Sequence, residues 1–183
     1  MTNRKKDLSY PYQGRNFLEL PENYFYAECS DKNYLSKYLE YRKSVISSIR
    51  SISYPDPADY PFIPSPKTDL YDLLDKSEKM FMKGKTSWLD SFCAKFETRK
   101  KFYKTYSRKD LTPRKGDGDA DSYSYIKFSK CLCSAYQKTG SFKYLSTLMK
   151  VNDVLCTLPF SYPDTEELLM VLEAELRFVS DVE

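Results

Sequence analysis

The sequence has 183 residues, enough for one well-buried domain, and 41% of them are hydrophobic, as in an ordinary globular protein. Its 29 Lys and Arg outnumber its 26 Asp and Glu, which gives a net charge of +3, and it has no histidine. Without histidine, no Ser-His-Asp or Cys-His arrangement and no His-ligated zinc site can form. Five glycines are too few for the many tight turns of an all-β sandwich or barrel.

The first 29 residues are predicted to be irregular, because Pro11, Gly14 and Pro21 interrupt any regular period. No apolar segment of a secretory signal follows the initial positive charges, and no stretch is long enough to span a membrane. We therefore expect a cytoplasmic protein with reduced thiols and no membrane association. The scattered cysteines lack zinc spacing, so we expect neither a metal nor another cofactor. They are Cys29, Cys93, Cys131, Cys133 and Cys156.

The first helix is predicted from about residue 30 to 52, with an apolar stripe on one side and Lys and Arg on the other. Residues 53–67 then contain five prolines, which no helix or central strand tolerates, so this segment should be an extended connector.

Five further helices follow from apolar residues that recur at helical spacing. They should span about residues 68–84, residues 86 or 87 into the segment after 95, 121–140, 141–159, and residue 164 onward. Residues 111–120 contain Pro113 and two glycines and are predicted to form a loop. The sequence thus predicts an all-α, single-domain bundle of about six helices in residues 30–183.

The short join around Gly140 predicts that the fourth and fifth helices form an antiparallel hairpin. This unit of about 38 residues has the length of a tetratricopeptide repeat. The repeat's sequence signature and a second copy are both missing, so we predict no repeat protein.

Residues 95–115 carry nine basic residues and only two acids, Glu97 and Asp110, for a local net charge of +7. The last twenty residues carry seven acids against Arg177, for a net charge of −6. This polarity should influence encounter with partners rather than the fold.

The basic segment also contains Phe96, Phe102, Tyr103 and Tyr106, an interleaving typical of proteins that stack nucleic-acid bases beside phosphate contacts. If the third helix continues through it, these aromatics, except Phe102, share one face with Arg99. Lys100, Lys101, Lys104 and Arg108 would then cover the solvent side, as on an ordinary helix. The candidate binding residues are Lys95, Arg99, Lys100, Lys101, Lys104, Arg108, Lys109, Arg114, Lys115, Tyr103 and Tyr106.

Asp117, Asp119 and Asp121 alternate like the start of a calcium loop, but Ser122 stands where that loop needs glycine and Phe128 where it needs glutamate. We therefore predict a solvated loop in which Asp121 caps the next helix, and no metal site. The other carboxylates are predicted at surface positions or helix caps, so no catalytic pair can be named.

Three functions fit the sequence. The favoured one is a non-catalytic helical protein that binds another macromolecule, most simply a protein, through its charge-polarised surface; the many tyrosines, which favour interfaces, support it. The second is a nucleic-acid-binding module that uses residues 95–115. The third is a small histidine-free enzyme whose Tyr, Lys and carboxylate groups come from separate helices. The oligomeric state is not predicted.

Overall fold

The computed structural model describes residues 32–51, 69–158 and 165–182. The predicted irregular segment at 1–29, the proline-rich connector at 53–67 and the predicted start of the last helix at Asp164 lie outside the described residues. Helices make up 77% of the described residues, and none of these residues belongs to a strand, which confirms the all-α class. The helices are α2 (Lys32–Arg50), α3 (Asp69–Met82), α4 (Ser87–Arg99), α5 (Ser122–Thr139), α6 (Phe142–Leu155) and α7 (Thr165–Val182).

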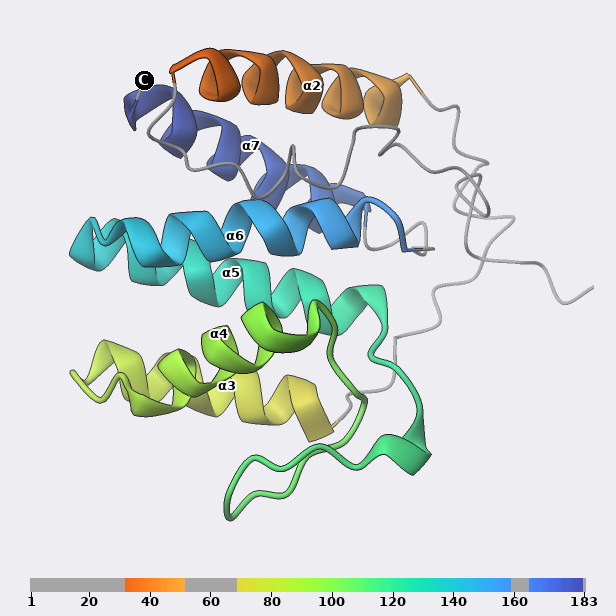
Figure 1. The fold of residues 1–183 in the computed structure, drawn as a ribbon, viewed down its shortest axis with the longest axis vertical. Helices are drawn as coiled ribbons and strands as arrows, with labels where there is room; N and C mark the ends of the chain where they lie inside the picture. Colours follow the sequence, from red (N-terminus) through yellow and green to blue (C-terminus); the bar gives the residue numbers. More distant parts are fainter. Residues whose placement is uncertain (1–31, 52–68, 159–164, 183) are drawn as a thin grey trace, which may run out of the picture.

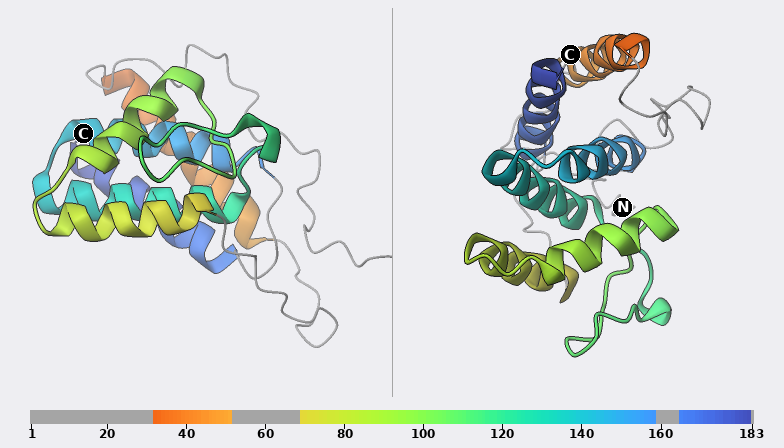
Figure 2. Two further views of the ribbon diagram at one scale, coloured as in Figure 1. Left: turned by 90° about the horizontal axis from the view of Figure 1, so that it is seen from below. Right: turned by 60° about the vertical axis from the view of Figure 1, so that its left-hand side comes forward.

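The helices form three stacked pairs (Figures 1 and 2). The α5/α6 pair lies in the middle, with α3/α4 on one side and α7 with α2 on the other. Helices α2 and α7 therefore lie side by side, although they come from opposite ends of the described chain. Stacked pairs of this kind bury one face of each pair against the next.

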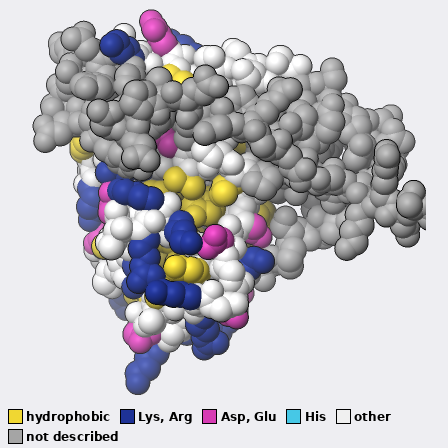
Figure 3. Space-filling view, turned by 45° about the vertical axis from the view of Figure 1, so that its right-hand side comes forward, with side chains coloured by type: hydrophobic (Ala, Val, Ile, Leu, Met, Phe, Trp, Pro, Cys, Tyr) yellow, Lys and Arg dark blue, Asp and Glu magenta, His cyan; other side chains and the backbone are white. Residues whose placement is uncertain are grey.

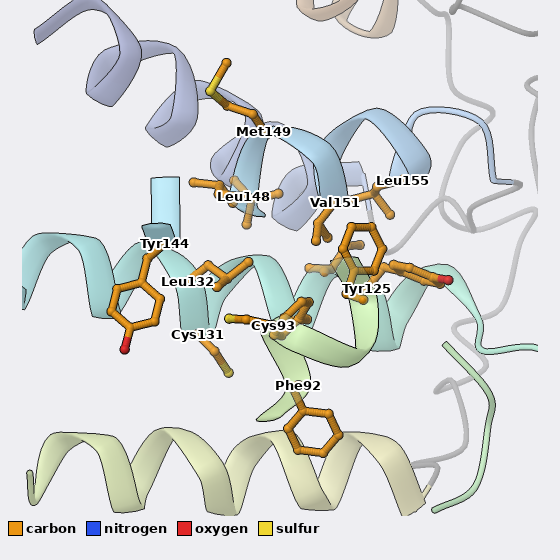
Figure 4. Packing of buried hydrophobic residues seen from close by; sticks show 14 of the residues in the cluster. Phe92, Cys93, Tyr125, Cys131, Leu132, Tyr144, Leu148, Met149, Val151 and Leu155 are labelled. Carbon is orange, nitrogen blue, oxygen red and sulfur yellow. The ribbon is translucent and has the colours of Figure 1, made fainter. Parts of the chain in front are cut away.

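The central pair contributes much of the core, as Figure 4 shows. Leu132 of α5 and Leu148 and Val151 of α6 are fully buried, and Phe92 of α4 is buried below them. Burying a side chain of this size stabilises a fold by roughly 1.5–3 kcal/mol, so these buried side chains determine how the pairs stack.

The helix ends follow the residues that favour them. The side chain of Asp121 accepts a hydrogen bond from the Ser124 N–H at 3.0 Å, so the predicted cap of α5 is confirmed. Gly140 ends α5 with φ +63°, a left-handed conformation in which its N–H donates to the Tyr136 carbonyl at 2.7 Å. The predicted hairpin of α5 and α6 is thereby confirmed.

The third helix enters the basic segment as predicted but covers only its first five residues, so the case in which it runs on through Tyr103 and Tyr106 does not hold. Helix α4 ends at Arg99, and Lys100 is left-handed with φ +56°. The reason is visible in the spacing of the aromatics. In a continuous helix Phe102 would lie about 240° around the axis from Phe96, away from the buried face of α4. The chain turns instead, and Phe102 enters the core with its ring 5.5 Å from that of Phe96.

Residues 100–121 form an irregular loop that folds back on itself, and we call it the basic hairpin. The Ala120 N–H donates to the Phe102 carbonyl at 3.0 Å, and the Lys104 N–H donates to the Gly118 carbonyl at 3.0 Å. The predicted loop at 111–120 is its returning half, with one short 3-10 turn at Lys115–Asp117. The two halves thus hold each other through backbone bonds without forming a strand.

Candidate functional site

The basic hairpin is anchored by Phe102. This side chain is fully buried, and its ring centre lies 4.9 Å from that of Phe128, 5.7 Å from that of Tyr125 and 6.1 Å from that of Phe92. Its backbone N–H donates to the Tyr125 hydroxyl at 2.8 Å. Edge-to-face and tilted ring pairs of this kind add to the gain from burial, so the hairpin has a defined position on α4 and α5.

The two tyrosines among the candidate binding residues do not form open stacking platforms. Tyr106 is 3% exposed and lies edge-on to Phe92, and its hydroxyl accepts a hydrogen bond from the Tyr103 N–H at 3.1 Å. Tyr103 is half-buried, with the Arg99 guanidinium 5.9 Å and the Lys101 ammonium 5.1 Å from its ring centre. Its ring already contacts two cations, which weakens the base-stacking interpretation.

The tip of the hairpin presents two cations. The Ser107 N–H donates to the Thr112 carbonyl at 2.9 Å, and the Thr112 N–H donates to the Asp110 carboxylate at 3.1 Å. Hydrogen bonds from the Ser107 and Thr112 side chains and the Thr112 backbone lower the pKa of Asp110 to about 2. Arg108 and Lys109 lie exposed between these bonds, so the tip holds its charges in place.

Two of the candidate lysines are occupied by ion pairs. Lys100 lies 3.0 Å from the Glu97 carboxylate, and Lys101 lies 3.1 Å from that of Asp119. They do not lie on the solvent side of a continued helix, because α4 ends before them. The other seven candidate cations form no ion pair with any carboxylate among the described residues, and all are exposed except the half-buried Lys95. They are Lys95, Arg99, Lys104, Arg108, Lys109, Arg114 and Lys115.

A groove of about 290 Å³ lies where α4 meets the hairpin. Its lining includes Ala94 and Tyr106 together with Pro113 from the returning half, and Lys95 and Arg99 are its two cations. Figure 3 shows Lys and Arg side chains gathered around exposed hydrophobic atoms over the lower part of the molecule, where α3, α4 and the hairpin lie. Apolar and cationic surface are thus adjacent on this face.

Several acids of the C-terminal helix α7 are paired or buried in the structure. On α7, Glu167 pairs with Lys130 at 2.9 Å, Glu173 pairs with Arg50, and Glu175 is buried. Of the five acids of α7, two therefore form half-exposed ion pairs and a third is buried.

A buried charge cluster joins α2, α6 and α7, and sequence reasoning missed it. Arg42 is 0% exposed, although the predicted stripe of α2 places Lys and Arg toward solvent. Its Nε donates to Glu175 at 3.1 Å, and one terminal nitrogen donates to both Asp153 and the Tyr38 hydroxyl at 2.5 Å. Asp153 is 5% and Glu175 0% exposed, so the prediction that carboxylates occupy surface or cap positions was wrong for both.

The cluster holds two carboxylates and one guanidinium. Asn152 donates to the second Glu175 oxygen at 2.5 Å, whereas Asp153 Oδ2 is buried without a hydrogen-bond partner in the described structure. Burial raises the pKa of Asp153 well above its ordinary value, against the attraction of Arg42, and Glu175 raises it further. Burial also raises the pKa of Glu175. The excess negative charge is therefore costly in the folded state.

Replacing Asp153 with asparagine should change the free energy of unfolding relative to the wild type by an amount that favours the variant more as the pH rises. A carboxyl whose folded pKa is raised contributes its full stability below its unfolded pKa of about 3.9, and that stability is lost as the pH rises toward the folded pKa. Asparagine does not titrate, so the difference in unfolding free energy should shift in favour of Asp153→Asn between acid and neutral pH. Urea titrations at several pH values measure it, and a difference independent of pH would contradict the raised pKa.

The tyrosines and cysteines give little surface chemistry. Side chains are described for nine of the 17 tyrosines, and all nine are buried or half-buried, so they do not supply the exposed interface residues that the composition suggests. The four described cysteines are free thiols, and burial raises the pKa of Cys93, Cys133 and Cys156 to about 12. Thiols with such values are poor nucleophiles near neutral pH.

The aspartates before α5 are dispersed. Asp121 caps the helix, Asp119 pairs with Lys101, and Asp117 lies exposed in the short turn. Within the described ranges, no group of three or more Cys, Asp or Glu side chains is placed to hold a metal ion.

The chain matches no protein-family model, no curated protein and no solved structure. Of the helices in the described part of the chain, none is both long and apolar enough to cross a bilayer.

Proposed function

We propose that this protein binds an acidic surface of a partner protein through the basic hairpin and the end of α4, and that its role is non-catalytic. One observation carries the proposal. Seven Lys and Arg side chains lie on this surface without an ion pair to any described carboxylate, and six of them are exposed. Two are on α4, and five are on a loop that Phe102 fixes to the core. Cations held in place lose less entropy on binding and steer an acidic partner during encounter.

A protein partner is favoured over nucleic acid by the state of the aromatics. Tyr106 is buried and Tyr103 contacts two cations, so neither offers a free ring for a base. The sequence pI of about 8.4 is also below that typical of a dedicated nucleic-acid-binding domain. The buried charge cluster gives little support to the hypothesis of a histidine-free enzyme. Its Arg42 is fully buried and bridges three helices in the interior.

The test compares two charge-reversed variants by fluorescence anisotropy with a labelled oligo-glutamate peptide. Changing Lys104, Arg108 and Lys109 to Glu should weaken binding at least about tenfold, and wild-type binding should fall as salt is added. A control with Lys43, Lys83 and Lys85 changed to Glu has the same net charge. These exposed lysines lie outside the hairpin, on α2 and in the join between α3 and α4. The control should bind nearly as the wild type does.

Two outcomes would contradict the proposal. Equal weakening in both variants would show a response to net charge alone, without a defined surface. Tighter binding of an oligouridylate of the same length at physiological salt would favour the nucleic-acid hypothesis, with a steep salt dependence from counterion release.

A further inference from the structure

We infer that the groove between α4 and the basic hairpin receives one apolar side chain of the acidic partner segment, flanked in that segment by carboxylates. This inference rests on the proposed function and specifies the partner: acidic residues around a single hydrophobic anchor, rather than a uniformly acidic surface.

The lining of the groove supplies the apolar part. Ala94 comes from the exposed side of α4, Pro113 from the returning half of the hairpin, and Tyr106 lies between them with its ring largely buried. The Arg114 N–H donates to the Thr105 carbonyl at 2.9 Å. This bond holds the residue after Pro113 against the first half of the hairpin. Backbone bonds and the aromatic core therefore fix the positions of the two elements that form the groove.

The two lining cations supply the charge complementarity. Lys95 and Arg99 are one helical turn apart on α4, and neither forms an ion pair with a described carboxylate. Carboxylates on either side of an inserted apolar side chain would face them. A purely aliphatic partner would leave both cations unpaired, and a uniformly acidic one would leave the apolar lining uncovered.

The size of the groove favours one side chain over a small-molecule cofactor. Its volume is about 290 Å³. Sites for small molecules typically measure about 300–1,000 Å³ and enclose most of the ligand, so this groove lies at their lower limit. A leucine or similar residue, held by charged neighbours, matches it better.

The experiment uses two fluorescein-labelled peptides in anisotropy titrations with the full chain. Both consist of glutamates around one central residue, which is leucine in one peptide and serine in the other. The leucine peptide should bind the wild type about tenfold more tightly, the gain expected from removing one leucine from water. Ala94→Phe fills the groove without changing any charge, and it should abolish this preference, so that the two peptides bind with equal affinity.

The outcomes separate this inference from the proposed function. Salt-dependent binding of both peptides with equal affinity would overturn the groove inference and leave the proposed function intact. Binding of neither peptide would overturn both. A leucine preference that persists in Ala94→Phe, with the far-ultraviolet circular dichroism and melting curve unchanged, would place the anchor elsewhere and contradict the groove.

Discussion

Replacing Arg42 with alanine is expected to lower the free energy of unfolding by about 3–5 kcal/mol, because it leaves two buried carboxylates without their cation. Arg42 contacts Glu175 at 3.1 Å and Asp153 at 2.5 Å, and both partners are almost inaccessible to water. Neither carboxylate can recover its hydration unless the contact between α2 and α7 opens. Urea unfolding followed by circular dichroism measures the loss.

Arg50→Ala is the matched control. Arg50 also bridges α2 and α7, through Glu173, but its side chain is 60% exposed. Exposed ion pairs contribute about 0–1 kcal/mol, so this variant should remain close to the wild type. A similar small loss in both variants would contradict the account of the buried charge cluster.

Replacing Arg42, Asp153 and Glu175 together with apolar residues of similar volume should restore much of the stability that Arg42→Ala loses.

The sequence allowed the helices to be predicted because their determinants are local. Val45, Ile46 and Ile49 of α2 recur at helical spacing and are buried. Asp121 and Gly140 mark the two ends of α5 for stereochemical reasons that need no tertiary contact. The start of α4 at Ser87 agrees with the predicted start, although the Thr86 side chain before it makes no capping hydrogen bond.

The buried charge cluster could not be predicted by hydrophobic pattern alone, although a signal was present. Arg42 falls four residues after Tyr38 and three before Val45, so it continues the apolar stripe of α2. Glu175 stands in the same way three residues after Leu172 on α7. A charged residue at a core position has to find a partner inside, but the sequence does not say which helix supplies it.

The basic hairpin could not be predicted either, because tertiary contacts determine its path. Phe102 is followed by polar and basic residues without a turn signal, and its partners Phe92, Tyr125 and Phe128 come from two other elements. The gain from burying this ring outweighs continuation of α4. The candidate cations are clustered in the sequence, whereas their separation into paired and unpaired members appears only in three dimensions.

Phe102→Ala should be the most damaging change in the hairpin. Phe102 is fully buried among five aromatic rings whose centres lie within 6.3 Å of its own. Removing such a ring typically costs about 3–5 kcal/mol through lost burial and the cavity left behind. The backbone bond from Ala120 to Phe102 should also weaken, so the Ala120 amide should exchange its hydrogen faster. Urea unfolding and hydrogen exchange measure the two effects.

Phe142→Ala is the control for Phe102→Ala, since Phe142 is 43% exposed at the start of α6 and its loss should cost far less stability.

The affinity of Phe102→Ala for the oligo-glutamate peptide also tests the proposed function. If the ring positions the cations, Phe102→Ala should weaken the oligo-glutamate complex under conditions in which circular dichroism shows that the helices remain folded, although every charge is retained. An unchanged affinity in the folded variant would show that the cations act without a fixed arrangement, and the hairpin would then be a general electrostatic attractor.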